Sequence, residues 1–167
     1  MKKFTLFLAF IVFLSCSAHA QLADKKVLTL DAAKKMTAAA EAEARKNGWN
    51  MAIAVVDDGG HLIHFNRIDG TQTGSIEIAI AKAKTAAAFK RATKVFEEIV
   101  KNRPAVVTVS PTAVMVEGGV PVFVNQQLVG AIGVSGASSQ QDGVVAEAGI
   151  AALELKEPTH QKTGLPN

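Results

Sequence analysis

The segment 115–136 constrains the fold more than any other stretch, because it reads as two apolar strands joined by a polar turn. Pro121 has no amide hydrogen and therefore suits the start of the first strand. Asn125–Gln127 form the expected reversal, and the second strand, Leu128–Val134, is almost entirely apolar. Such a strand is typical of the centre of a sheet, where both faces are covered. Its two glycines would let a neighbouring element approach the backbone closely.

The rest of the chain predicts a second hairpin and four helices. The hairpin runs from Met51–Val56 to His61–Arg67 across the turn Asp57–Gly60. Apolar periodicity, capping residues and glycine or proline stops predict helices from Thr29 to Gly48, from about Thr73–Ser75, from about Thr93 to Asn102 and from Ser138 or Ser139 to about Leu155. Short reversals force antiparallel neighbours, so the sequence predicts an α+β layer structure.

Two details of this prediction concern the middle of the chain. The second helix is expected to turn one stripe to the core and a lysine-bearing face to solvent. The stripe is Ile76, Ile80, Ala83 and Ala87, and the lysines are Lys82, Lys84 and Lys90. The segment Ala105–Val114 is β-branched but contains a proline, and we expect it to be irregular or to lie at a sheet edge.

The first 20 residues have the pattern of a signal peptide. Lys2 and Lys3 precede the apolar run Phe4–Leu14, and a small-residue cleavage pattern ends at Ala20. The apolar run is too short to span a bilayer. Export to the periplasm or the medium is therefore expected. The alternative is a lipoprotein modified at Cys16, although the residues before this cysteine fit that signal only loosely.

Cleavage after Ala20 would leave 147 of the 167 residues. They are expected to form a single domain at 21–155 and a flexible, polar tail at 156–167. Loss of Lys2 and Lys3 reduces 18 basic residues to 16, against 15 acidic ones. This near-neutral balance, without a basic stripe interleaved with aromatics, predicts no nucleic-acid partner. The only cysteine is also lost, so no disulfide or thiol chemistry is expected in the mature chain.

Three motifs in order carry a resemblance to a known family. They are VVDDGGHLIHFNRIDG, SIEIAIAKAKTAAAF and EGGVPVFVNQQLVGAIGVSG, the last followed by QD. Over roughly residues 28–155 the chain resembles the haem-binding family that includes HbpS, GlcG and the C-terminal domain of PduO. The resemblance implies a profilin-like fold with a five-stranded antiparallel sheet, assembly as a homo-oligomer that is often an octamer, and haem as cofactor.

The histidines are the candidates for binding the haem iron, because neutral imidazole is a natural axial ligand. His61 follows the Gly59–Gly60 corner and matches the family's usual histidine, whereas His64 matches it less well. Three residues apart on a strand, the two would point to opposite faces, so one chain cannot clamp an iron between them. In the alternative interpretation His61 caps the turn and His64 lies half-exposed on the sheet.

Five further positions are candidates for cofactor binding. Glu117, beside Gly118 and Gly119, is a possible site acid or iron ligand, or the polar end of a turn that glycine permits. Ser138 could offer backbone donors to a propionate or small carboxylate, although helix capping alone explains it. Arg67 could pair with such a carboxylate, or lie exposed at a strand end.

The first functional hypothesis is an exported haem-binding protein, with a site near Gly59–His61 and Glu117–Pro121. The alternatives are a module that binds a small carboxylate or another metabolite, and an enzyme that degrades haem. The sequence shows no nucleophile–base, metalloprotease, phosphate-loop or dinucleotide motif, so an enzyme would depend on a cofactor. Whether the protein is an enzyme is left open, and a binding protein is favoured.

Overall fold

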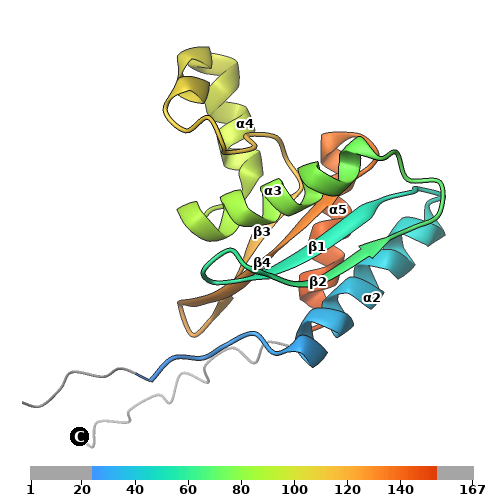
Figure 1. Ribbon diagram of the computed structural model, residues 1–167. Coiled ribbons are helices and arrows are strands. Elements are labelled where there is room, and N and C mark those ends of the chain that lie inside the picture. The colour runs from blue at the N-terminus through green and yellow to red at the C-terminus, as the bar shows by residue number, and fades with distance from the viewer. Residues whose placement is uncertain (1–23, 154–167) are drawn as a thin grey trace, which may run out of the picture.

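A four-stranded antiparallel sheet is the centre of the computed structural model, which describes residues 24–153 (Figure 1). The signal peptide, Cys16 and the tail at 156–167 therefore lie outside the described residues. The sheet order is β2-β1-β4-β3. The strands are β1 (Ala52–Asp57), β2 (Leu62–Arg67), β3 (Gly119–Val124) and β4 (Gln127–Ser135). Each hairpin thus supplies one central strand and one edge strand, and β4 is central as its apolar sequence predicts.

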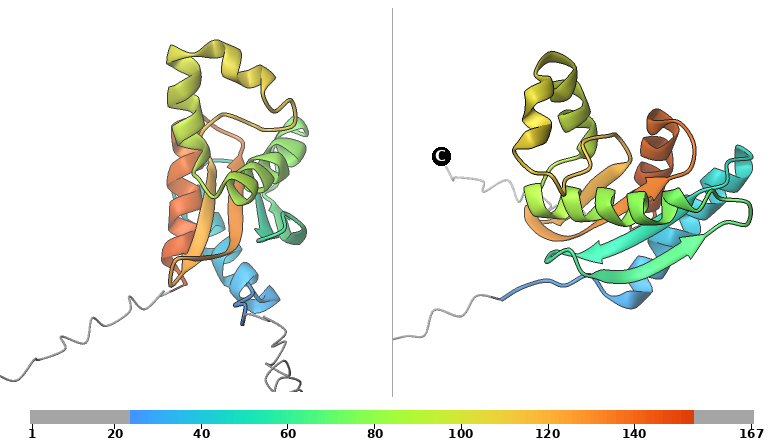
Figure 2. Two further views of the ribbon diagram at one scale, coloured as in Figure 1. Left: turned by 90° about the vertical axis from the view of Figure 1, so that its left-hand side faces the viewer. Right: turned by 45° about the horizontal axis from the view of Figure 1, so that its top comes forward.

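Helices cover both faces of this sheet (Figures 1 and 2). One face carries α2 (Leu30–Lys46) and α5 (Ser139–Ala151), which also pack against each other. The other face carries α3 (Gly74–Phe89). From the end of α3 the chain continues into α4 (Thr93–Asn102) and a 3-10 helix, η1 (Pro104–Thr108), which project away from the sheet. The structure confirms the α+β class and the order of the elements.

The sheet has four strands in the described residues, and not the five that the resemblance implied. The segment after α4 does not pair with the sheet. Two prolines, Pro104 and Pro111, remove backbone donors there, and the chain forms η1 followed by turns. The irregular path predicted for Ala105–Val114 is therefore confirmed, and the profilin-like description stays a prediction.

Local signals in the sequence explain where most elements begin and turn. Thr29 caps α2 by accepting a hydrogen bond from the N–H of Ala32 at 3.2 Å, and Ser138 caps α5. Between β3 and β4 the turn is Asn125–Gln126, and both residues have positive φ, as a tight hairpin turn requires. The predicted three-residue reversal was one residue too long. Helix α5 ends at Ala151, whereas about Leu155 was expected.

Two buried clusters lie on the two faces of the sheet. The larger one packs α2 and α5 against Ile53, Val55 and Ile132, while the smaller one packs alanines of α3 against Ala52, Ala54 and Val56. Consecutive residues of β1 thus alternate between the faces. At Gly133 a Cβ would clash with the α3 backbone, with Ala83 N only 2.5 Å away. Close approach of a helix is therefore the reason for this glycine, as predicted.

The buried side of α3 differs from the prediction in one important way. Ile76 and Ile80 are only half-buried, and the fully buried positions include Ala79, Ala83 and Lys82. Lys84 and Lys90 are exposed as expected, but Lys82 is 2% exposed, so its assignment to a solvated face was wrong. The reason is a partner 60 residues away in the sequence, Asp142 on α5.

None of the helices between residues 24 and 153 combines the length and the apolar character that a membrane-spanning helix needs.

Candidate functional site

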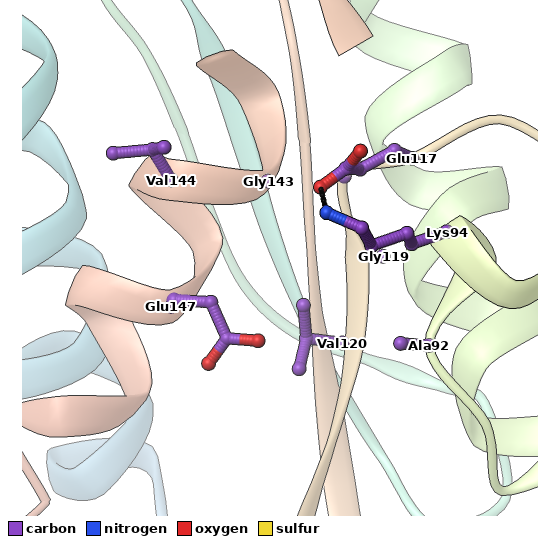
Figure 3. Close-up of a pocket in the computed structure, with 9 residues that line it drawn as sticks. Ala92, Lys94, Glu117, Gly119, Val120, Gly143, Val144 and Glu147 are labelled. Carbon is purple, nitrogen blue, oxygen red and sulfur yellow. Dashed lines mark hydrogen bonds and ion pairs between the residues drawn. The ribbon is translucent and has the colours of Figure 1, made fainter. Parts of the chain in front are cut away.

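A cavity of about 360 Å³ opens at the start of β3, between the first turn of α4 and one side of α5 (Figure 3). It contains three of the residues predicted from the sequence, Glu117, Gly118 and Gly119. Its lining consists of these three together with Ala92, Lys94, Val120, Gly143, Val144 and Glu147. The volume lies at the lower end of the range of small-molecule sites, about 300–1,000 Å³. We call it the Glu117 cavity.

Glu117 is held both at its side chain and at its backbone. Its carboxylate accepts a hydrogen bond from Lys94 Nζ at 3.1 Å, and its backbone N–H donates to the Glu97 carboxylate at 2.7 Å. A Cβ on Gly143 would lie 2.5 Å from Glu117 Oε1, so the missing side chain in α5 makes room for this carboxylate. Only 14% of the Glu117 side chain is exposed. The carboxylate thus lies against Gly143 of α5 and pairs with Lys94 of α4.

The two glycines after Glu117 form a gap through which a lysine crosses the sheet layer. Lys82 Nζ donates to Asp142 Oδ2 at 2.7 Å and to the Val134 carbonyl at 3.1 Å. A Cβ on Gly118, whose φ is +125°, would lie 2.8 Å from Lys82 Nζ. A Cβ on Gly119 would lie 2.8 Å from Thr93 Cγ2. The Glu-Gly-Gly corner is therefore required by close packing, whatever ligand the cavity takes.

Asp142 is buried with Lys82 beneath this corner. Its second oxygen accepts a hydrogen bond from the Ala137 N–H at 3.2 Å. Burial raises the pKa of the Asp142 carboxyl above its ordinary value, and the ammonium of Lys82 offsets only part of this effect. The sequence placed Asp142 in the first turns of the last helix but gave no signal for its partner. A lysine within the alanine stripe of α3 was the one available hint.

Ser138 caps α5 and does not line the cavity. Its hydroxyl accepts a hydrogen bond from the Gln141 N–H at 3.3 Å, and its own N–H donates to Gln141 Oε1 at 3.1 Å. This reciprocal pair is a capping box. The capping interpretation of Ser138 therefore has a direct structural explanation, and its role toward a propionate stays a prediction.

The other predicted residues lie at the opposite edge of the sheet. His61, His64 and Arg67 belong to β2 or the residue before it, and β1 and β4 separate them from β3. One chain therefore does not bring His61 and Glu117 into one pocket, contrary to the site expected from the sequence. The order of the strands in the sheet determines how far apart His61 and Glu117 lie, and the two hairpin patterns in the sequence do not specify that order.

His61 lies on the surface beside an ordered carboxylate. Its side chain is 83% exposed, and its Nδ1 lies 3.3 Å from Asp57 Oδ1. The same oxygen accepts hydrogen bonds from the N–H groups of His61 at 2.8 Å and Gly59 at 2.9 Å. Burial favours a raised pKa for the Asp57 carboxyl, but these hydrogen bonds and the imidazole hold its pKa below the ordinary value. The imidazole is therefore accessible and has an ionised partner.

His64 and Arg67 differ from His61 in their surroundings. His64 is half-buried against α2, where its Nδ1 lies 3.1 Å from the Thr37 hydroxyl. Arg67 is exposed at the end of β2. Among residues 24–153, no group of three or more histidine, cysteine or acidic side chains could hold a metal ion.

A second cavity, of about 430 Å³, was not predicted from the sequence. It lies between the second half of α3 and the segment that precedes β3, and no acidic residue lines it. Its lining is Ala81, Lys84, Thr85, Ala88, Phe89, Ser110, Thr112 and Ala113. The Thr85 hydroxyl accepts a hydrogen bond from the Val114 N–H at 2.9 Å, which holds the segment over α3. We call it the Lys84 cavity.

Comparison with known proteins agrees with the layered fold. The family model described as haem degrading protein HbpS-like matches residues 28–151. The chain belongs to the HbpS-like family. Protein GlcG of Escherichia coli K12 is 43% identical over 111 residues, which are 66% of this chain and 83% of GlcG.

Solved structures of this family superpose on most of the chain. A double mutant of HbpS from Streptomyces reticuli has a TM-score of 0.74 and 33% identity, covering 83% of this chain and 94% of HbpS. The PduOC–haem complex has a TM-score of 0.73 and 27% identity, covering 78% of this chain and 98% of PduOC. These likenesses confirm the family that the three sequence motifs indicated.

Proposed function

We propose that the protein is an exported haem-binding protein in which His61 is the iron ligand. The observation that carries this proposal is the pairing of an exposed imidazole with the Asp57 carboxylate. A carboxylate at Nδ1 favours the tautomer with its proton on that nitrogen, and leaves Nε2 free to bind a metal. HbpS-like membership and the haem complex of PduOC support haem as the group bound.

The turn before β2 suits this role because it leaves room for the ring beside Asp57. A Cβ on Gly59 would lie 2.9 Å from His61 Nδ1, so a side chain there would push the imidazole away from Asp57. Porphyrin supplies the other in-plane ligands of the iron, and a single protein imidazole is a sufficient axial ligand. Arg67, exposed at the end of β2, is the residue that we propose to pair with a propionate.

A homo-oligomer is part of the proposal, because His61 lies on an open surface and not in either cavity. Haem bound there needs a second surface to exclude water. Association is favoured by the edge strands β2 and β3 and by three exposed valines, Val95 of α4, Val107 of η1 and Val109 just after η1. Light scattering of the mature protein at micromolar concentration tests this, and a stable monomer would contradict it.

Export rests on the N-terminal sequence. The positive start, apolar run and small-residue pattern ending at Ala20 favour cleavage there. Fractionation of expressing cells, with sequencing of the mature N-terminus, tests it. Recovery of the uncleaved chain from the cytoplasm would contradict export, and a lipid on Cys16 would support the lipoprotein alternative.

The haem proposal is tested by titrating the mature protein with hemin. We expect a shifted Soret band that saturates at a defined ratio and weakens strongly in His61→Ala. His64→Gln is the matched control, because it changes the other histidine of the hairpin and should leave the band unchanged. Equal binding by His61→Ala would contradict the iron-ligand assignment, and a band that never saturates would contradict a specific haem site.

The second candidate function is binding of a small carboxylate, and the Lys84 cavity favours it. Lys84 is the one charged residue in its lining, while Ala88 and Phe89 supply apolar contacts. Thermal-shift titrations with acetate, glycolate and benzoate test it against Lys84→Met. A saturable shift that disappears in this variant supports the carboxylate role, whereas no shift with any of the three contradicts it.

A further inference from the structure

The charges around the Glu117 cavity do not balance. Its lining contains two carboxylates, Glu117 and Glu147, and one cation, Lys94. Lys94 already pairs with Glu117. Glu147 makes no hydrogen bond or ion pair within residues 24–153, and its carboxylate points from α5 toward Val120 across the open space (Figure 3). Glu147 belongs to the exposed part of the lining, and the residues around the cavity carry one more carboxylate than cations.

The contact made by Lys94 places an ammonium group against a carboxylate in the wall of this cavity. A primary ammonium ion lies 3.1 Å from a carboxylate that is largely buried in the cavity wall. The Lys94 side chain is itself 63% exposed, and exposed ion pairs of this kind are weak and are screened by salt. A ligand ammonium could therefore displace Lys94 from Glu117 at little cost, and would gain Glu147 as a second partner.

The remaining walls suit a short apolar tail. Val120 of β3, Val144 of α5 and Ala92 just before α4 contribute apolar side chains, and Val144 is 51% exposed. Covering such a surface with a ligand's methylene groups is favourable. Gly118, Gly119 and Gly143 line the cavity with backbone atoms only.

We propose that the Glu117 cavity is a binding site for small organic ammonium ions with a short alkyl or aryl tail. An anion would meet two carboxylates and a lysine that is already neutralised. The site is separate from the haem proposal, because β1 and β4 lie between it and His61.

Calorimetric titration with n-butylammonium and n-butyrate tests this inference at low salt, because the two probes match in size and differ in charge. We expect saturable binding of butylammonium and none of butyrate. Glu147→Gln should weaken binding about 5–10-fold, in line with the loss of one charged partner. Glu77→Gln, which makes the same change at an exposed position of α3, should have no effect.

Lys94→Met distinguishes an ammonium-binding site from an anion-binding site that depends on Lys94. If a ligand ammonium replaces Lys94 at Glu117, removing the internal competitor should tighten butylammonium binding several-fold. Weaker binding in Lys94→Met, an unchanged affinity in Glu147→Gln, or butyrate binding that depends on Lys94 would each overturn the proposal. Hemin titration of Glu147→Gln should match the wild type, so failure of one proposal leaves the other testable.

Discussion

Lys82 and Asp142 form a buried ion pair of 2.7 Å between helices that cover opposite faces of the sheet. The lysine side chain passes the start of β3, where Gly118 and Gly119 have no side chains to block it. It also donates to the Val134 carbonyl, and Val134 N–H in turn donates to the Gly118 carbonyl at 2.9 Å. One contact thus joins α3, α5 and the corner that carries Glu117.

Lys82→Met should destabilise the protein strongly, because it leaves the Asp142 carboxylate buried without its cation. Removing one partner of a buried ion pair typically costs about 3–5 kcal/mol. Urea unfolding followed by circular dichroism measures the change in the free energy of unfolding. The matched control is Lys84→Met on the exposed side of α3, which should change stability by less than about 0.5 kcal/mol. Equal effects of the two variants would contradict the importance of the pair.

The stability of the protein should depend on pH through Asp142. Burial raises the pKa of this carboxyl above its ordinary 3.8, so the folded state holds the proton more tightly than the unfolded state. The stabilising contribution of this proton is therefore fully present below pH 3.8 and is lost as the pH rises through the folded pKa. Relative to Asp142→Asn, the wild type should lose stability over this window. A relative gain in unfolding free energy with rising pH would show that Lys82 outweighs burial.

Gly143→Ala should disturb Glu117 although alanine favours helices. On propensity alone the change would stabilise α5 by up to about 1 kcal/mol. However, the new Cβ would lie 2.5 Å from Glu117 Oε1, and overpacking of this kind costs about 1–3 kcal/mol. We therefore expect no gain in unfolding free energy, and weaker binding of butylammonium. Gly74→Ala in α3, where no atom lies within 4 Å of the new Cβ, is the control. A more stable Gly143→Ala variant with unchanged binding would contradict the contact.

The features that sequence predicted correctly are local ones. Thr29 and Ser138 cap helices through residues three positions away, and the apolar run of β4 indicates burial on both faces without any knowledge of its neighbours. Short turns then force the antiparallel pairings. These signals were sufficient to predict the α+β class, and the three sequence motifs were sufficient to predict the family.

The features that sequence missed depend on distant partners. In α3 the buried side consists mostly of alanines and other small residues, whereas the three isoleucines are half-buried or exposed. Hydrophobicity therefore could not show that Ala79 is buried while Ala88 is exposed. In the sequence nothing distinguishes Lys82 from its exposed neighbour Lys84, because the difference depends on the contact with Asp142 in the folded chain. Likewise, His61 and Glu117 were expected to lie at one site. The order β2-β1-β4-β3 separates them.

Asp57→Asn should weaken haem binding at His61 without unfolding the hairpin. Asparagine keeps an oxygen that can accept from the N–H groups of Gly59 and His61, but it loses the charge that favours a proton on Nδ1. Loss of such a partner typically costs about 10–100-fold in metal affinity. Hemin titration measures the change, and Asp58→Asn is the control, because this carboxylate pairs with Lys25 on the surface at 2.6 Å. If both variants bind hemin as the wild type does, Asp57 does not orient an iron ligand. If both lose binding equally, the turn as a whole matters and not the Asp57–His61 pair.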